Sequence, residues 1–161
     1  GSIEGQVLQI FADAYTPVVD SSAIPTGEIA SVEGTPMDFR TEKQIGQDIR
    51  ADFEQLHFTG GYDHNYVLGR SGEKKIMANA YCRESGIALE AATDCCGVQF
   101  YAGNFIGEQT GKGGAAYHDR SAFCLESQFY PNAVNEPDFP SPVVKAGDTY
   151  HTETSYQFYL R

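Results

Sequence analysis

The strongest constraint on the fold is a two-residue alternation at the end of the sequence. Over residues 149–161 one face of an extended chain would carry Tyr150, Thr152, Thr154, Tyr156, Phe158 and Leu160. The opposite face would carry polar and charged side chains, with Tyr159 as the single exception. Because side chains of a β-strand point alternately to its two faces, this period predicts a long strand with one face buried.

Five further segments show strand-like patterns: Gln6–Ala14, Lys74–Arg83, Ile87–Thr93, Val98–Ala102 and Ala122–Gln128. Glu84-Ser85-Gly86 separates two of them and is typical of a hairpin turn. The chain has 161 residues, the length of one ordinary domain. We therefore expect an all-β, antiparallel β-sandwich in which residues 1–161 belong to a single domain.

One stretch has a helical spacing. Ile45, Ile49, Phe53 and Leu56 lie four, four and three residues apart, and Thr41 precedes them as a possible N-cap. This spacing predicts a helix over residues 45–56. Two long loops, 103–120 and 129–143, hold much of the glycine and proline, and loops of such length in a compact β domain are usually functional or unusually well packed.

The charge balance narrows the range of partners. The chain has 22 Asp and Glu against 11 Lys and Arg, for a formal net charge of −11. Such a chain repels phosphate groups, so we expect neither nucleic acid nor an anionic membrane surface as a partner. No apolar run approaches the roughly 20 residues of a membrane-spanning helix. A neutral small molecule is the ligand class that this charge favours.

Four cysteines, Cys82, Cys95, Cys96 and Cys124, do not have the paired spacing of a zinc site. Neighbouring Cys95 and Cys96 are unsuited to bonding each other, because a disulfide between adjacent residues strains the backbone. We therefore expect reduced thiols, no bound metal and a reducing compartment, the cytoplasm.

A carboxylate stands in the middle of one apolar strand. On the predicted strand 122–128, alternation places Glu126 on the same face as Cys124 and Gln128. A carboxylate in such a strand is unfavourable unless it is solvated, paired or functional. The pattern therefore marks Glu126 as a candidate catalytic residue, with a solvated strand face as the alternative.

Two further polar side chains lie among aromatic residues. The same alternation places Gln99 and Tyr101 together on one strand face, an arrangement that suits sugar binding and equally suits core packing. Asp63 follows two glycines in Tyr62-Asp63-His64-Asn65-Tyr66, where it could bind a ligand or cap a structural turn. The residues alone leave both pairs of alternatives open.

Six segments, in order along the chain, resemble those of the aldose 1-epimerase family. They are Pro25–Glu28, Gly34–Arg40, Tyr62–Tyr66, Gly97–Asn104, Phe123–Gln128 and Asn135–Ser141. The resemblance covers essentially the whole chain and the latter half of a family member. Adjacent Cys95 and Cys96 depart from the family's usual residues there, with no evident catalytic meaning.

The resemblance implies a galactose mutarotase-like supersandwich that interconverts the α and β anomers of aldoses such as galactose and glucose. It implies that Glu126 acts as the general base and that Asp63 and Gln99 hydrogen-bond sugar hydroxyls. The reaction needs an acid and a base but no metal or cofactor. In the family the acid is a histidine that precedes the matched region, and none of the four histidines here matches the motif of that catalytic histidine.

Two expectations about the chain by itself follow from the resemblance. We expect it to be catalytically inactive alone, and to self-associate or to pair with the first half of the sandwich. Two other function classes remain as rivals: a non-catalytic carbohydrate-binding module, and a glycosidase that uses Asp63 and Glu126 as a carboxylate pair.

Overall fold

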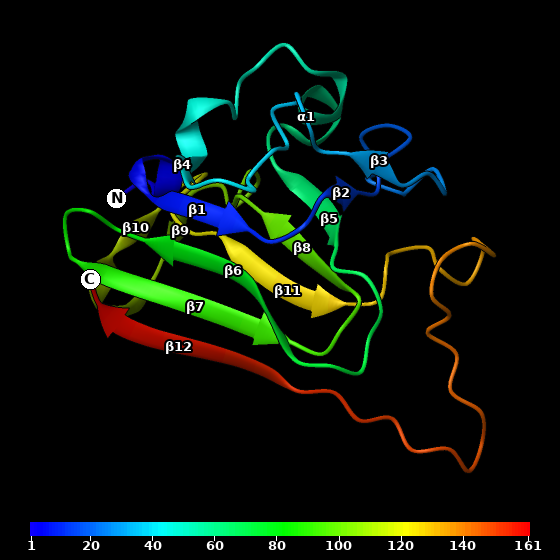
Figure 1. Ribbon diagram of the computed structural model, residues 1–161. Helices are drawn as coiled ribbons and strands as arrows, with labels where there is room; N and C mark the ends of the chain where they lie inside the picture. Colours follow the sequence, from blue (N-terminus) through cyan, green and yellow to red (C-terminus); the bar gives the residue numbers. More distant parts are fainter.

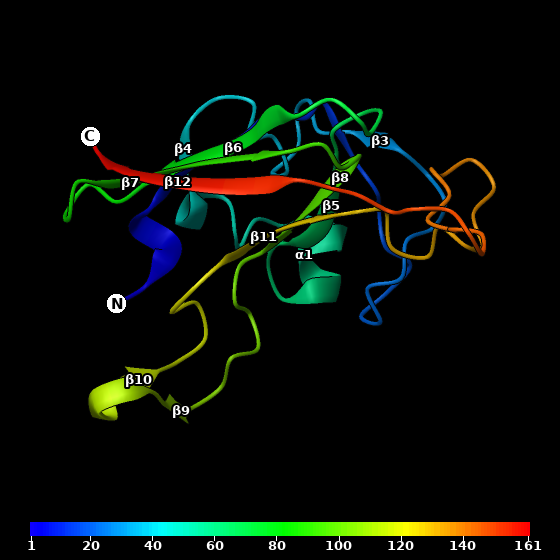
Figure 2. The same ribbon diagram turned by 90° about the horizontal axis from the view of Figure 1, so that it is seen from below.

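The computed structural model describes residues 1–161 as two stacked antiparallel sheets (Figures 1 and 2). The first sheet has the order β12-β7-β6-β1-β4 and the second β11-β8-β5-β2-β3, while β9 and β10 form a separate hairpin. The strands are β1 Val7–Ile10, β2 Ala14–Tyr15, β3 Ala30–Ser31, β4 Lys43–Gln44, β5 Asp63–Val67, β6 Lys75–Tyr81, β7 Ile87–Thr93, β8 Gly97–Tyr101, β9 Gln109–Thr110, β10 Ala116–Tyr117, β11 Cys124–Gln128 and β12 Thr154–Leu160. The predicted all-β, antiparallel architecture is confirmed.

The core lies between the two sheets. β1 and β6 contribute Leu8, Ile10 and Met77 from one side, and β8 contributes Val98 and Phe100 from the other. The predicted alternation on β8 is therefore confirmed, because Val98 and Phe100 are fully buried while Gln99 on the opposite face is not. The second sheet thus has one face in the core and one face that carries polar side chains.

The helix predicted over residues 45–56 is wrong. The structure has a 3-10 turn at Ile45–Gln47 and a separate six-residue helix, α1, at Glu54–Thr59. Thr41 caps neither, because the following residues Lys43–Gln44 form β4 and pair with β1. The apolar residues of the stretch still pack in or against the core, because short turns bring them there without disrupting the pairing of β4 with β1.

The prediction that one face of the last strand is buried is also wrong for this chain. β12 begins at Thr154 rather than Thr149 and pairs only with β7, at the edge of the first sheet. Its apolar side chains are largely exposed, Phe158 by 69% and Leu160 by 81%. The alternation predicted the strand and its two faces correctly, but nothing in this chain buries the apolar one.

Shorter features complete the architecture. The loop 103–120 contains the β9–β10 hairpin and a 3-10 turn, Lys112–Gly114, and projects away from both sheets (Figure 2). A further 3-10 turn, Ile3–Gly5, precedes β1. The predicted turn at Glu84-Ser85-Gly86 is confirmed, with Gly86 in the left-handed region that suits glycine. No helix has the length and apolar content needed to cross a membrane.

Candidate active site

The three residues predicted to act on a sugar lie on three neighbouring strands. β5, β8 and β11 are adjacent in the second sheet, and their register places Asn65, Gln99 and Glu126 in one row. Asp63 lies one row away, opposite Tyr101. Because alternate side chains share a face, Asp63, Gln99 and Glu126 all project from the side of the sheet that faces away from the core. The structure therefore brings the three residues together, and Asp63 lies in a strand rather than at a turn.

These side chains line a cavity of about 380 Å³ at the surface of the second sheet. Its walls are formed by Asp63, Gln99, Tyr101, Phe105, Glu126, Gln128 and Pro131. Carboxylates and amides on the floor, with aromatic rings and a proline beside them, are the groups that bind a neutral polyhydroxy ligand. Phe105 and Pro131 come from loops after β8 and β11, so strand periodicity could not have identified them.

Asp63 and Gln99 are already joined. The Gln99 Nε2 donates to Asp63 Oδ1 over 2.8 Å. Burial raises the pKa of the Asp63 carboxyl above its ordinary value, and the hydrogen bond from Gln99 opposes that rise. One oxygen of Asp63 is thereby held by the protein, and its other oxygen has no hydrogen-bond partner within the chain.

Glu126 occupies a more open position. Its side chain is exposed and forms no salt bridge in this chain, so the partial burial expected of a general base is not provided by these residues. The thiol of the neighbouring Cys124 is affected by both carboxylates of the site. Burial is the largest cause that raises the pKa of the Cys124 thiol, and the charges of Glu126 and then Asp63 add to it. The site therefore carries negative charge from two strands, β5 and β11.

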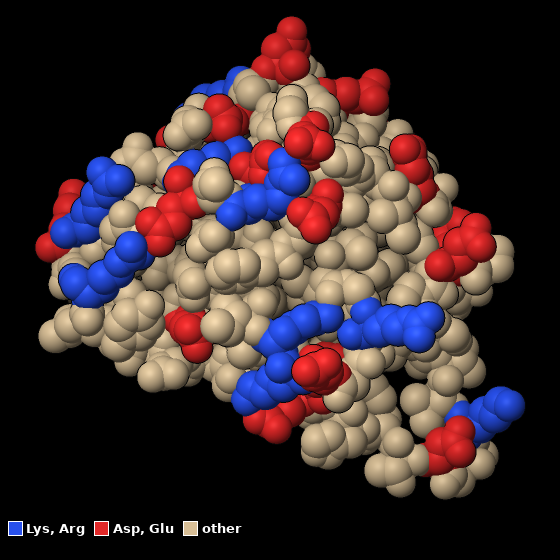
Figure 3. Space-filling model, viewed as in Figure 1, with Lys and Arg blue, Asp and Glu red and all other residues tan.

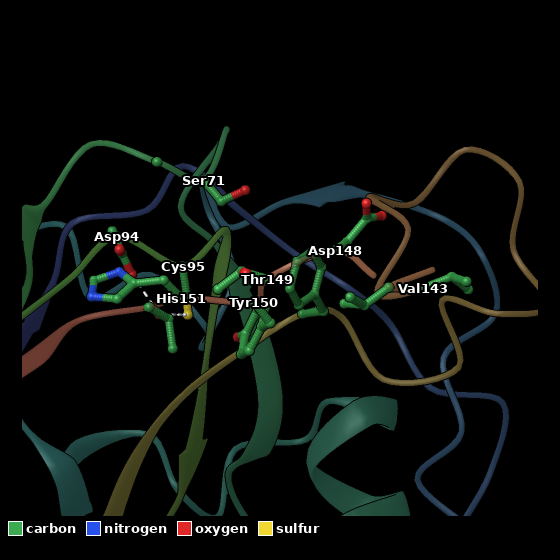
Figure 4. A pocket seen from close by; sticks show the side chains of 12 residues that line it. Ser71, Asp94, Cys95, Val143, Asp148, Thr149, Tyr150 and His151 are labelled. Atoms are coloured by element: carbon green, nitrogen blue, oxygen red, sulfur yellow. Dashed lines mark hydrogen bonds between the residues drawn. The ribbon is translucent and has the colours of Figure 1, made fainter. Parts of the chain in front are cut away.

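A second, larger cavity of about 510 Å³ lies at the far end of the first sheet, under the segment that leads into β12 (Figure 4). Its polar groups bond to one another: Thr152 Oγ1 donates to Asp94 Oδ1 over 2.5 Å and lies 3.0 Å from Cys95 Sγ. None of the predicted sugar-contacting residues lines it. Size alone would favour this cavity, but its Asp94 carboxylate already accepts from the Thr152 hydroxyl and from the Glu153 backbone N–H.

Most basic side chains on the surface lie beside acidic ones (Figure 3), which outnumber them 22 to 11. On the face drawn in Figure 3 the basic side chains lie beside acidic ones. Arg40 pairs with Asp38 at 2.7 Å, and Arg161 pairs with Glu42 at 2.8 Å. The candidate site contains two carboxylates and no basic side chain, so it suits an uncharged ligand better than an anionic one.

Comparisons with known proteins identify the family of the chain. The family profile described as Aldose 1-epimerase matches residues 1–157. The chain is 45% identical to galactose mutarotase from Sus scrofa over 150 residues, which cover 92% of this chain and 42% of the relative. It is 37% identical to aldose 1-epimerase from Escherichia coli (strain K12) over 159 residues, which cover 97% of this chain and 45% of the relative.

A solved structure of an aldose epimerase homologue from C. elegans superimposes with a TM-score of 0.81 at 27% identity, covering 99% of this chain and 47% of that one. The chain thus spans less than half the length of the relatives it matches. The resemblance predicted from six segments is confirmed by a profile that covers nearly all residues and by the fold. The chain belongs to the aldose 1-epimerase family.

Proposed function

We propose that the protein containing this chain is an aldose 1-epimerase, which interconverts the α and β anomers of aldohexoses such as galactose and glucose. The observation that carries the proposal is the grouping of Asp63, Gln99 and Glu126 over one surface cavity. We further propose that residues 1–161 form the C-terminal part of a single β-sandwich domain.

The proposed reaction opens and recloses the sugar ring. A base removes the proton of the C1 hydroxyl while an acid protonates the ring oxygen, and the ring opens to the aldehyde. Rotation about C1–C2 and reversal of the same steps then give the other anomer. Only protons are transferred, so one base and one acid suffice.

We assign the base to Glu126, because its carboxylate projects freely into the cavity from the middle of β11. Asp63 and Gln99 hold the sugar: the unpaired oxygen of Asp63 accepts from a hydroxyl, and the Gln99 amide donates to one. Holding the ring in this way selects the oxygen that meets Glu126.

The acid is a separate requirement. No histidine lines the cavity, and its only other ionisable groups are the carboxyl of Asp63 and the phenol of Tyr101. We propose that the general acid comes from another part of the protein and that this chain alone does not turn over sugar. A base by itself cannot protonate the departing ring oxygen.

We also propose that the exposed apolar face of β12 is covered in the functional protein. Phe158 and Leu160 are exposed on a strand that is paired along one side only. Such an edge offers unpaired backbone groups together with apolar surface, so it favours association. Either the rest of the sandwich or a second copy would pair the free backbone groups of β12 and cover its apolar surface. Light scattering on this chain alone should therefore show self-association.

The proposed location is the cytoplasm. All four cysteines are free, and Cys95 and Cys96 are buried thiols. A reducing compartment keeps such thiols in this state.

Polarimetry of freshly dissolved α-galactose tests the function. The full-length protein should accelerate the drift of optical rotation towards equilibrium, and this chain alone should leave it at the uncatalysed rate. Sugar binding without any acceleration would instead favour a carbohydrate-binding module. Release of an aglycone from a galactoside would favour a glycosidase, because mutarotation cleaves no glycosidic bond.

A further inference from the structure

A second glutamine lies beside the sugar-contacting residues and has no assigned role. Gln128, at the end of β11, is on the same face as Glu126 and pairs in register with Gly97. Its Nε2 lies 3.1 Å from Gln99 Oε1 and 3.3 Å from Asn65 Oδ1. One amide nitrogen therefore donates to two amide oxygens on two neighbouring strands.

These bonds fix the direction of the Gln99 side chain. An amide has one oxygen, which accepts, and one NH₂ group, which donates. Because the oxygen of Gln99 accepts from Gln128, its NH₂ group must face the other way, towards Asp63, where it donates over 2.8 Å. A reversed Gln99 would set its oxygen against the Asp63 carboxylate. The chain of bonds runs from Gln128 through Gln99 to Asp63.

Asn65 anchors the other end of this network. Its side chain is only 2% exposed, and its oxygen accepts from Gln128. Reversal of Asn65 would bring two NH₂ groups face to face, so Gln128 sets its direction as well. The Nδ2 of Asn65 has no partner. A buried donor without a partner is unfavourable, and the arrangement at Asn65 therefore gives up a hydrogen bond to keep its oxygen towards Gln128.

Gly97 makes the network possible by leaving space. A Cβ at this position would lie 2.4 Å from Asn65 Oδ1 and 3.0 Å from Tyr130 Cδ1. The backbone of Gly97 is ordinary strand, so the requirement is for space rather than for unusual torsion angles. With no side chain opposite it, Gln128 can extend across β8 and reach β5.

We propose that Gln128, held by Asn65, is a positioning residue for aldose recognition: it locks the Gln99 amide so that Asp63 presents its unpaired oxygen to a sugar hydroxyl. The proposal rests on the proposed function, because it concerns the same site. It assigns Gln128 an effect through Gln99 and not a contact with the reacting atoms.

The test is Gln128→Leu in the full-length protein, followed by polarimetry with galactose. The KM should rise about tenfold, the equivalent of one ordinary hydrogen bond, while kcat changes less. Gln128→Glu retains the size but removes the donor, so it should raise the KM at least as much. Gln109→Leu, an exposed position on β9, is the matched control and should leave the KM unchanged.

A double mutant separates positioning from direct contact. In a Gln99→Ala background, Gln128→Leu should add no further rise in the KM, since the amide that it orients is gone. A full additive effect in that background would overturn the proposal. An unchanged KM in both Gln128→Leu and Gln128→Glu would overturn it as well.

A second readout does not depend on turnover. Hydrogen exchange of the Gln99 side-chain NH₂, followed by NMR in the full-length protein, should be slow in the wild type and faster in Gln128→Leu. If the wild type shows no mutarotation, the proposed function fails, and this exchange measurement still tests the network. Equal exchange rates in the two proteins would contradict the positioning role even if mutarotation is observed.

Discussion

β11 and β12 invite comparison, because each is the edge strand of its own five-stranded sheet and each alternates apolar and polar side chains. On β11, Leu125 is buried in the core and Glu126 lines the cavity. On β12, Phe158 and Leu160 have the same apolar character and lie in solvent. The two strands even touch, since Tyr156 donates its hydroxyl proton to the Leu125 carbonyl over 2.7 Å.

The difference shows what an alternating pattern can and cannot predict. Period two determines which side chains share a face, because it follows from strand geometry alone. Whether a face is covered depends on what packs against it. The first sheet, across the core, supplies that cover for Leu125, whereas nothing in residues 1–161 supplies it for the end of β12.

The largest expected effect concerns Glu126, the carboxylate on β11. Glu126→Gln in the full-length protein should lower kcat by roughly 10²–10⁴, the usual contribution of a general base, and change sugar affinity little. Polarimetry on α-galactose measures it. Glu73→Gln, in an exposed loop, removes the same charge and should have no effect. A Glu126→Gln variant within threefold of the wild type would exclude Glu126 as the base.

The next effect concerns Asp63, which lies across the cavity from β11. Asp63→Ala removes a charged hydrogen-bond acceptor for a sugar hydroxyl, so the KM should rise roughly 10- to 150-fold, with a smaller fall in kcat. Steady-state polarimetry separates the two constants. Asp52→Ala, at a fully exposed carboxylate, is the control. A loss of thermal stability with an unchanged KM would show that Asp63 serves only the fold.

A leucine-to-alanine substitution on each edge strand compares how much the buried and the exposed side chain contribute to stability. Leu125→Ala should lower the free energy of unfolding by about 2–5 kcal/mol, because it empties a packed position in the core. Leu160→Ala should change it by less than about 0.5 kcal/mol in dilute monomeric chain, because the side chain is already in water. Urea unfolding, at concentrations where light scattering shows a monomer, measures both. Equal losses would mean that β12 is covered after all.

The last prediction concerns pH and the core-facing side of β5. His64 is fully buried, and burial lowers its pKa from the ordinary 6.5 to about 4. Between these values the unfolded chain takes up a proton that the folded chain does not. The contribution of His64 to stability should therefore be constant above pH 6.5 and fall as the pH drops towards 4, by about 3 kcal/mol in total.

The midpoint of urea unfolding, measured at several pH values between 4 and 6.5, gives this loss of stability. His64→Leu should flatten the slope, whereas the exposed His57→Gln should leave it as in the wild type. An unchanged slope in His64→Leu would mean that the buried imidazole is not its source.

Much of the fold could be predicted from the sequence because local pattern determines it. The alternation of Val98, Gln99 and Phe100 predicted a strand and the faces of that strand, and both are correct. The helix over 45–56 was wrong, because its spacing could not reveal that Lys43–Gln44 pairs with β1. β5 was not predicted as a strand, since its polar and aromatic residues after two glycines also suit a turn.

The grouping of the candidate residues agrees with the prediction, and their roles toward a sugar are proposals. Resemblance in short segments predicted Asp63, Gln99 and Glu126, and the structure places them in one cavity. The contacts of Gln128 were not predictable, because they depend on the register of three strands and on the space left at Gly97. Such cross-strand relations have no signature in the linear sequence.

The position of bound galactose is the most direct test of the roles proposed for Glu126, Asp63 and Gln99. A crystal structure of the full-length protein with galactose should place the C1 hydroxyl within about 2.6–3.2 Å of a Glu126 carboxylate oxygen, with Asp63 and Gln99 bonded to neighbouring hydroxyls. Galactose found instead in the cavity beside Asp94 and Tyr150, with Glu126 remote from C1, would contradict it.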